Sequence, residues 1–277
     1  MTMAGARAPG PTDGAGVLRA TFVHLPGIGP ATEAELWRRG IRDWTMLARS
    51  AAGPRGSTRG SLTGALAESE RALAEGDVAW FGRRLPDREH WRLYPGFRER
   101  TAFLDIETTG LSPYEGIVTV VSVHGGGSTR TFVAGEDLEE LPAHLRRFPL
   151  LATFNGSRFD VPFLQATFPQ LVVPPVHIDL RFLLYRIGLA GGLKRIEATL
   201  GLGDRRGVEG IDGLQAVRLW QEFRRGSRPA LDRLVRYNRA DTTNLEPLLA
   251  FAVRELTARL FPNAGPRAPP SAAVAGA

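Results

Sequence analysis

Hydrophobic and polar positions repeat in two different ways along the chain. Up to about residue 100 the apolar positions recur at helical spacing, as in residues 61–76, where Leu62, Leu66 and Leu73 precede a terminal Gly76. From residue 101 onward, short apolar runs rich in β-branched residues predict strands. The pattern therefore predicts a helical N-terminal region followed by a region that contains a β-sheet.

The predicted elements of the second region follow a mixed order. Strands are expected at 101–108, 116–125, 129–135, 150–155 and 176–179, and helices at 136–147, 162–168, 179–188, 193–200, 212–225 and 230–257. Three strands in succession predict an antiparallel meander, and the later alternation of strands and helices is typical of parallel strands. We expect Pro247 to kink or restart the last helix, because proline lacks the amide donor of its own turn. The prediction is an α/β fold with a mixed sheet flanked by helices.

Composition divides the chain further. Residues 1–16 and 261–277 are dominated by glycine, alanine and proline and are expected to be disordered tails, and residues 53–61 are expected to be a linker. Residues 17–100 form the helical region, with helices expected at 30–39 and 44–50 in addition to 61–76. Residues 101–260 form the sheet-containing domain.

Overall composition excludes several classes of protein. Of 277 residues 43% are hydrophobic and 23% charged, and there is no cysteine, which excludes disulfides, thiolate metal sites and cysteine nucleophiles. There is no apolar run of membrane-spanning length and no signal-like start, so we expect a cytoplasmic protein. The net charge of +6 suits a nucleic-acid partner. However, every basic residue except Lys194 is arginine, which is also typical of a GC-rich genome.

The segment FLDIETTGL carries the first candidate site. Asp105 and Glu107 are two apart on a strand, so both side chains point to the same face. Carboxylates side by side on a buried strand repel each other, and a divalent cation such as Mg²⁺ or Mn²⁺ relieves that repulsion. The alternative is an edge strand with solvated acids. Thr108, Thr109 and Gly110 are expected to form a turn whose open backbone amides face a substrate.

Two later segments carry further acids. In FNGSRFDVPFL, Asp160 follows an Asn155–Gly156 turn, and it is either a metal ligand or the cap of the next helix. In YNRADTTNL, Tyr237 and Asp241 are four apart and share one face of a helix. One interpretation is that Tyr237 orients a water molecule while Asp241 binds metal. The alternative is that Tyr237 is a core residue and Asp241 a solvated acid.

Taken together, these segments resemble a known family. The order D-x-E, D and Y-x-x-x-D is similar to that of the DEDD (DnaQ-like) 3′–5′ exonucleases, in the subtype with tyrosine in the third motif. The segments LPGIGPATEAELWRRGIRDW, FGRRLPDREHWRL, GLKRIEATLGL and GIDGLQAVRLW extend the resemblance to YprB-type ribonuclease-H-like proteins of bacteria, over roughly residues 20–256. All five motif positions are present. The resemblance implies a ribonuclease-H-like fold.

The resemblance also implies a mechanism. Two divalent cations, Mg²⁺ or Mn²⁺, are expected at the phosphodiester, and Asp105 is expected to bridge them. Glu107 and Asp241 would complete the site of one cation, and Asp160 would hold the other. Tyr237 would position the attacking water. The implied function is a metal-dependent 3′–5′ exonuclease acting on single-stranded DNA or RNA. The alternatives are an endonuclease with the same site and a nucleic-acid-binding module that uses the fold for docking.

A few other residues are candidates for contacts with substrate. Lys194 begins a helix where it can meet a phosphate, Asn155 contacts substrate or holds its turn, and Asp179 caps a helix or lies near the metals. The segment LPGIGPATEAEL resembles the hairpin of a helix-hairpin-helix motif. Its Gly27 and Gly29 let backbone amides approach a phosphate, unless the segment is only a tight turn.

Overall fold

A mixed β-sheet forms the centre of the C-terminal part of the chain. The structure, a computed structural model, describes residues 15–50 and 59–260. In these ranges five strands form one sheet of order β3-β2-β1-β4-β5: β1 (Thr101–Thr108), β2 (Val118–Gly125), β3 (Ser128–Val133), β4 (Leu150–Thr153) and β5 (Val176–Asp179). The first three strands form an antiparallel meander, and β4 and β5 run parallel to β1. The predicted mixed sheet is confirmed.

Strand β1 is central and has two different faces. Ala102, Leu104 and Ile106 belong to a hydrophobic cluster on one face together with residues of the helices beneath it. Phe103, Asp105 and Glu107 alternate with them and point to the other face. A bulge follows Glu107 in the pairing with β2 and ends the regular ladder there. The two carboxylates therefore lie side by side near the end of a buried strand.

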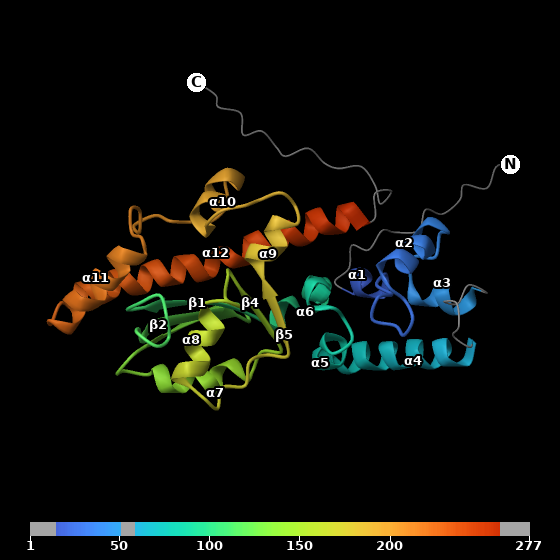
Figure 1. Cartoon of the computed structure of the whole chain (residues 1–277), viewed down its shortest axis with the longest axis horizontal. Coiled ribbons are helices and arrows are strands. Elements are labelled where there is room, and N and C mark those ends of the chain that lie inside the picture. Colours follow the sequence, from blue (N-terminus) through green and yellow to red (C-terminus); the bar gives the residue numbers. More distant parts are fainter. Residues whose placement is uncertain (1–14, 51–58, 261–277) are drawn as a thin grey trace, which may run out of the picture.

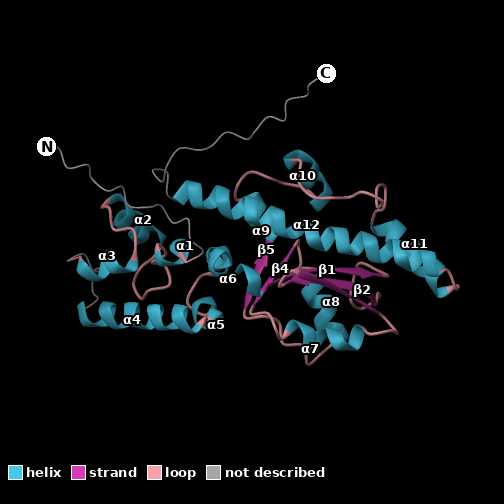
Figure 2. Cartoon of the chain, turned by 180° about the vertical axis from the view of Figure 1, so that it is seen from behind, coloured by secondary structure: helices cyan, strands magenta, loops and turns pink. Residues whose placement is uncertain are grey.

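Helices cover both faces of the sheet (Figures 1 and 2). One face carries the 33-residue helix α12 (Arg228–Leu260), together with α9 (Leu180–Tyr185), α10 (Leu193–Leu200) and α11 (Gly213–Arg224). The other face carries α7 (Leu141–Leu145) and α8 (Asp160–Thr167), with the short 3₁₀ helix η3 (Leu138–Glu140) before α7. The helix expected at 136–147 is thus shorter than predicted and divided, and the one expected at 162–168 begins at Asp160.

Helix α12 is not restarted at Pro247. It continues through this residue, so that prediction was wrong. A proline inside a helix costs about 3 kcal/mol because one hydrogen bond is lost and the ring clashes. Here Leu245, Leu248 and Leu249 are fully buried on either side of the proline, and the packing of these side chains outweighs the cost.

The N-terminal region consists of helices, several of them very short. They are α1 (Gly16–Arg19), α2 (Pro30–Arg38), α3 (Trp44–Arg49), α4 (Arg59–Glu75), α5 (Val78–Gly82), η1 (Asp87–Leu93), α6 (Tyr94–Phe97) and η2 (Arg98–Arg100). The three predicted helices are confirmed as α2, α3 and α4. Gly16, assigned to the tail, begins α1, and residues 59–61, assigned to the linker, belong to α4. Ala15, also assigned to the tail, precedes α1 as its N-cap residue, and the remaining tail and linker residues lie outside the described ranges.

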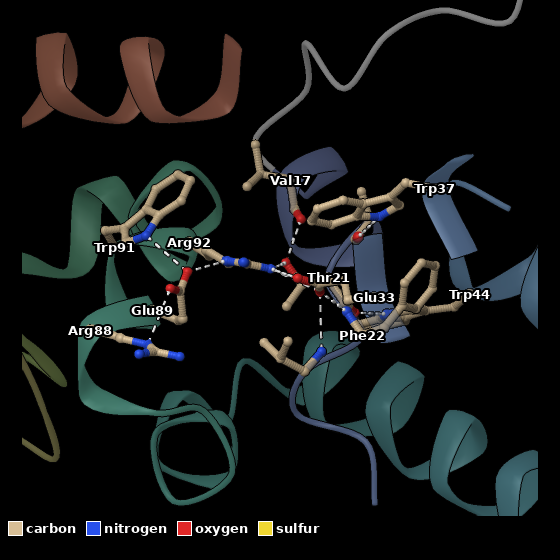
Figure 3. Close-up of polar contacts among 12 residues, drawn as sticks. Val17, Thr21, Phe22, Glu33, Trp37, Trp44, Arg88, Glu89, Trp91 and Arg92 are labelled. Atoms are coloured by element: carbon tan, nitrogen blue, oxygen red, sulfur yellow. Dashed lines mark hydrogen bonds and ion pairs between the residues drawn. The ribbon is translucent and has the colours of Figure 1, made fainter. Parts of the chain in front are cut away.

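A buried ionic network holds the N-terminal region together (Figure 3). The Arg92 guanidinium donates from Nη1 to both Glu33 oxygens at 2.9 Å and from Nε to Glu89 Oε2 at 2.7 Å. Glu33 also accepts from the amides of Phe22 and Val23 at 2.6 and 3.1 Å. Buried charges persist when they are paired in this way. The network ties α2 and the hairpin before it to η1.

The N-terminal region and the sheet share one hydrophobic core. The largest buried cluster runs from Leu18 and Trp44 in the first region to Phe103 on β1 and Leu249 on α12. The predicted boundary at residue 101 coincides with the start of β1, but the packing continues across it. Among the described helices, none combines the length and apolar character needed to cross a bilayer.

Candidate metal centre

Strand β1 and helix α12 bring three carboxylates together. One oxygen atom from each of Asp105, Glu107 and Asp241 lies within 4.8 Å of the other two. Glu107 and Asp241 are buried, and Asp105 is partly exposed. The arrangement follows from two periodicities: alternation on the strand places Asp105 and Glu107 on one face, and α12 crosses that face. The sequence prediction that these three acids share a site agrees with this geometry.

The electrostatics of this cluster favour a bound cation. Burial raises the pKa of Asp105 well above its ordinary value, and the charges of Asp241, Asp160 and Glu107 raise it further. Burial and the neighbouring Asp241 likewise raise the pKa of Glu107. Bringing several buried carboxylates together is costly unless positive charge compensates. An all-oxygen donor set of this kind suits Mg²⁺ or Mn²⁺.

Asp160 lies at the first position of α8. The residue that caps this helix is Phe159, so the interpretation of Asp160 as a helix cap was wrong. Its side chain is buried, and burial raises its pKa to about 7, although a hydrogen bond from the Ile106 amide opposes the shift. Asp160 is not one of the three clustered carboxylates, but its charge raises the pKa of Asp105. It therefore lies close enough to the cluster for its charge to act on Asp105.

Asp179 orders the loop that leads to Asp160. One of its oxygens accepts from the amides of Asn155 at 2.8 Å and Arg181 at 3.1 Å, and the other accepts from the Ser157 hydroxyl at 2.6 Å. Asp179 is thus the cap of α9, as one of the two interpretations proposed. Asn155 has a left-handed φ of 65° and its side chain accepts from Arg181 at 2.7 Å. It holds its turn, and its contact with substrate stays a prediction.

Tyr237 and Asn238 support the cluster from α12. The Tyr237 hydroxyl hydrogen-bonds to Asp241, and burial together with the nearby carboxylates raises the pKa of Tyr237, so the hydroxyl remains a donor. Asn238 Nδ2 donates to Asp105 Oδ2 at 2.8 Å and to the Asp105 carbonyl at 3.2 Å. Sequence reasoning missed Asn238. Its only signal was its position beside Tyr237 in a helix whose interior does not favour asparagine.

Two cations reach the cluster from α10 and from the loop that follows it. Lys194 on α10 places its Nζ 4.6 Å from the centre of the Tyr237 ring and donates to the Ile211 carbonyl. Its charge lowers the pKa of both Glu107 and Asp241. Arg205 lies in the following loop, with Nη1 2.5 Å from Asp241 Oδ1. Lys194 was predicted near the site, whereas nothing in the sequence distinguished Arg205 from the many other arginines.

The turn after β1 is less open than predicted. The Thr109 amide donates to the Ile117 carbonyl at 3.0 Å, and the Ile117 amide donates to the Thr109 hydroxyl at 3.0 Å. The Thr108 hydroxyl donates to the Gly110 carbonyl at 2.6 Å. The prediction of open amides was therefore wrong for Thr109, because the turn closes on its own loop. The neighbouring Leu111 is almost fully exposed.

The glycines of the predicted hairpin lie just before α2. Gly27 has a left-handed φ of 76°, which favours glycine, and Gly29 caps α2 without a side-chain bond. Pro30 occupies the first turn as predicted. The Glu33 carboxylate, bound to the amides of Phe22 and Val23, fixes the chain that leads into the hairpin. Phosphate binding by the two glycines stays a prediction.

Comparisons with solved structures find distant likenesses to this chain. The family B DNA polymerase from the hyperthermophilic archaeon Pyrobaculum calidifontis is 19% identical over 56% of this chain, with a TM-score of 0.44, and the chain spans 24% of that polymerase. Brucella melitensis NrnC bound to pGG is 19% identical over 59% of this chain and 81% of its own, with a TM-score of 0.34. Brucella melitensis NrnC with bound Mg²⁺ is 20% identical over 62% of this chain and 92% of its own, with a TM-score of 0.32.

The family assignment rests on a separate match. No curated protein matches the chain. Residues 102–253, which make up more than half of the chain and include all four acids and, apart from the first residue of β1, all five strands, match the RNase_H superfamily. The mixed sheet flanked by helices is the corresponding fold. The chain therefore belongs to the RNase_H superfamily.

Proposed function

We propose that this chain is a metal-dependent nuclease, specifically a 3′–5′ exonuclease of the DEDD family with tyrosine in the third motif, close to the YprB-type proteins. The observation that carries the proposal is the convergence of Asp105, Glu107 and Asp241, within 4.8 Å of one another, with the Tyr237 hydroxyl bonded to Asp241. Membership of the RNase_H superfamily supports phosphodiester hydrolysis as the reaction.

The carboxylates fit a pair of divalent cations. Asp105, Glu107 and Asp241 would hold one Mg²⁺ or Mn²⁺, and Asp160 with Asp105 would hold a second. Bound cations supply Lewis acidity and lower the pKa of a coordinated water. The four acids need such compensation, because burial raises the pKa values of all four, and repulsion within the group raises those of Asp105 and Glu107 further.

The surrounding side chains have separate roles in this proposal. The Tyr237 hydroxyl, kept protonated by its raised pKa, donates to Asp241, and its oxygen would accept a hydrogen bond from the attacking water and so orient it. Asn238 fixes the Asp105 carboxylate through its 2.8 Å bond. Lys194 supplies a positive charge beside Glu107 and Asp241, where a substrate phosphate would approach.

The proposed substrate is a single strand of DNA or RNA with a free 3′ end. The net charge of +6 favours a polyanion. Thr108, Thr109 and Gly110 follow the carboxylates on β1, and Asn155 precedes Asp160, so both turns lie next to the proposed metal ligands. We assign contacts with the substrate strand to these residues and to Lys194.

The direct test is hydrolysis of oligonucleotides labelled at the 3′ or the 5′ end, in DNA and RNA versions, with Mn²⁺, Mg²⁺ or EDTA. The expected result is metal-dependent release of mononucleotides from the 3′ end, lost in Asp105→Asn and Asp241→Asn. The matched control is Asp232→Asn, which makes the same charge change on the exposed side of α12.

Other results would replace the proposal. Cleavage of a circular single strand would show an endonuclease. Binding of labelled strands without any hydrolysis by the folded wild type would instead show a docking module. Hydrolysis that persists in both active-site variants would place the chemistry away from this cluster.

A further inference from the structure

Arg205 contacts the metal cluster through one edge of its guanidinium. Nη1 lies 2.5 Å from Asp241 Oδ1, an oxygen of one of the three clustered carboxylates. The other two nitrogens point the opposite way, toward Glu197 on α10: Nε contacts Oε2, and Nη2 donates to Oε1 at 3.0 Å. One guanidinium therefore joins a proposed metal ligand to a carboxylate that the proposed mechanism does not use.

Glu197 is a fixed anchor for this arginine. Its side chain is buried, and Oε1 also accepts from Asn244 Nδ2 at 3.1 Å. Asn244, one turn beyond Asp241 on α12, accepts from the Asp204 amide at 2.9 Å and so also holds the backbone beside Arg205. The bidentate pair and these two bonds fix the position of the guanidinium, since a forked arginine contact leaves little freedom.

The loop that carries Arg205 packs closely against Asn244. Gly203 has a left-handed φ of 89°, and a Cβ atom there would lie 2.7 Å from Asn244 Nδ2. Only glycine fits such a position without displacing the amide. The loop between α10 and α11, which passes over α12 (Figure 1), is thus built to hold Arg205 at one place.

A metal ion and Arg205 would both bind the Asp241 carboxylate. A divalent cation held by Asp105, Glu107 and Asp241 needs a lone pair of each carboxylate, and the guanidinium lies on Asp241 Oδ1. Two positive groups at one carboxylate also repel each other. We propose that Arg205 competes with divalent metal for Asp241 and thereby sets the metal affinity of the site. This inference rests on the proposed metal centre.

A purely orienting role makes the opposite prediction. If Arg205 only held Asp241 in the right direction, its loss would weaken metal binding. If Arg205 competes, its loss tightens binding, because the Asp241 carboxylate loses its ion pair and the cluster becomes more negative. An opposite charge this close to a carboxylate changes its affinity for a proton by roughly tenfold to a thousandfold, so we expect the loss of Arg205 to raise the affinity for a divalent cation by at least about tenfold.

The experiment is calorimetric titration of MnCl₂ and MgCl₂ into the full chain. The variants are Arg205→Gln and, as the matched control, Arg206→Gln, whose exposed side chain pairs with Asp204. Both remove one positive charge at adjacent positions. We expect Arg205→Gln to bind Mn²⁺ at least about tenfold more tightly than wild type, and Arg206→Gln to match wild type.

A second variant tests the inference even if Arg205→Gln fails to fold. Arg205→Gln leaves Glu197 buried without its partner, so the double variant Glu197→Gln/Arg205→Gln replaces the ion pair by two amides and keeps the net charge. Tighter binding in this variant supports competition independently of overall charge. Unchanged or weaker binding in a folded variant, judged by circular dichroism, overturns the inference.

Asp241→Asn separates failure of the inference from failure of the metal centre. If this variant loses metal binding while Arg205→Gln binds no more tightly than wild type, only the competition is wrong. If wild type and Asp241→Asn bind Mn²⁺ equally, the proposed metal centre is wrong and the inference falls with it.

Discussion

Replacing Asp160 by asparagine should stabilise the metal-free chain, and increasingly so as the pH rises from 5 to 8. The Asp160 carboxyl is buried at the start of α8, and burial raises its pKa to about 7 from an ordinary value of 3.8. In the folded chain this group therefore retains a proton that the unfolded chain has already released. Folding then takes up a proton, and stability falls with rising pH.

The size of the effect follows from the two pKa values. Below pH 3.8 both states are protonated and the group costs nothing; between 3.8 and about 7 the cost grows by about 1.4 kcal/mol per pH unit. Above pH 7 it levels off at about 4 kcal/mol. Asparagine does not titrate, so the stability difference between Asp160→Asn and wild type should grow by about 2–3 kcal/mol between pH 5 and pH 8.

The assay is urea unfolding in EDTA at pH 5 and pH 8, with Asp232→Asn as the control for a change of charge on the surface. The asparagine still accepts from the Ile106 amide but adds an amide donor to a buried site, so the change between the two pH values is the decisive quantity. A difference between Asp160→Asn and wild type that is the same at both pH values would refute the reasoning. So would a difference that shrinks with rising pH.

Three further outcomes are expected. Tyr237→Phe should lower the hydrolysis rate by about a hundredfold while calorimetry shows Mn²⁺ binding unchanged, since only the water-orienting hydroxyl is lost; a loss of Mn²⁺ binding would contradict this role. Leu104→Ala should lower the free energy of unfolding by about 2–5 kcal/mol, measured in urea, because Leu104 is fully buried. Arg92→Met should destabilise the chain by about 3–5 kcal/mol, because Glu33 would stay buried without its arginine, while Glu89 would keep its ion pair with Arg186; a thermal melt equal to that of wild type would show that the network contributes no stability.

Local periodicity explains what the sequence could predict. The shared face of Asp105 and Glu107 follows from the two-residue repeat of a strand, and the pairing of Tyr237 with Asp241 follows from the helical repeat. Both depend only on residues close in sequence. The mixed sheet could also be predicted, because a meander followed by alternating strands and helices is compatible with few fold architectures.

The residues that were missed depend on contacts between distant segments. Asn238 acts only because α12 crosses β1, and Arg205 acts only because Glu197 and Asn244 hold it against Asp241. The contacts of Asn238 and of Arg205 cannot be predicted from the residues next to them in the sequence. The uninterrupted helix at Pro247 has the same cause, because packing on both sides outweighed the local preference.

The position of Lys194 over the ring of Tyr237 has a practical consequence. Because Lys194 is the only lysine of the chain, its ε-amine is also the only side-chain amine available to reagents that acylate or reductively alkylate such groups. A small isotopic or fluorescent label attached by this chemistry would therefore be placed, apart from the terminal amine, at the carboxylate cluster alone. The composition thus provides a spectroscopic probe of the site without any engineered residue.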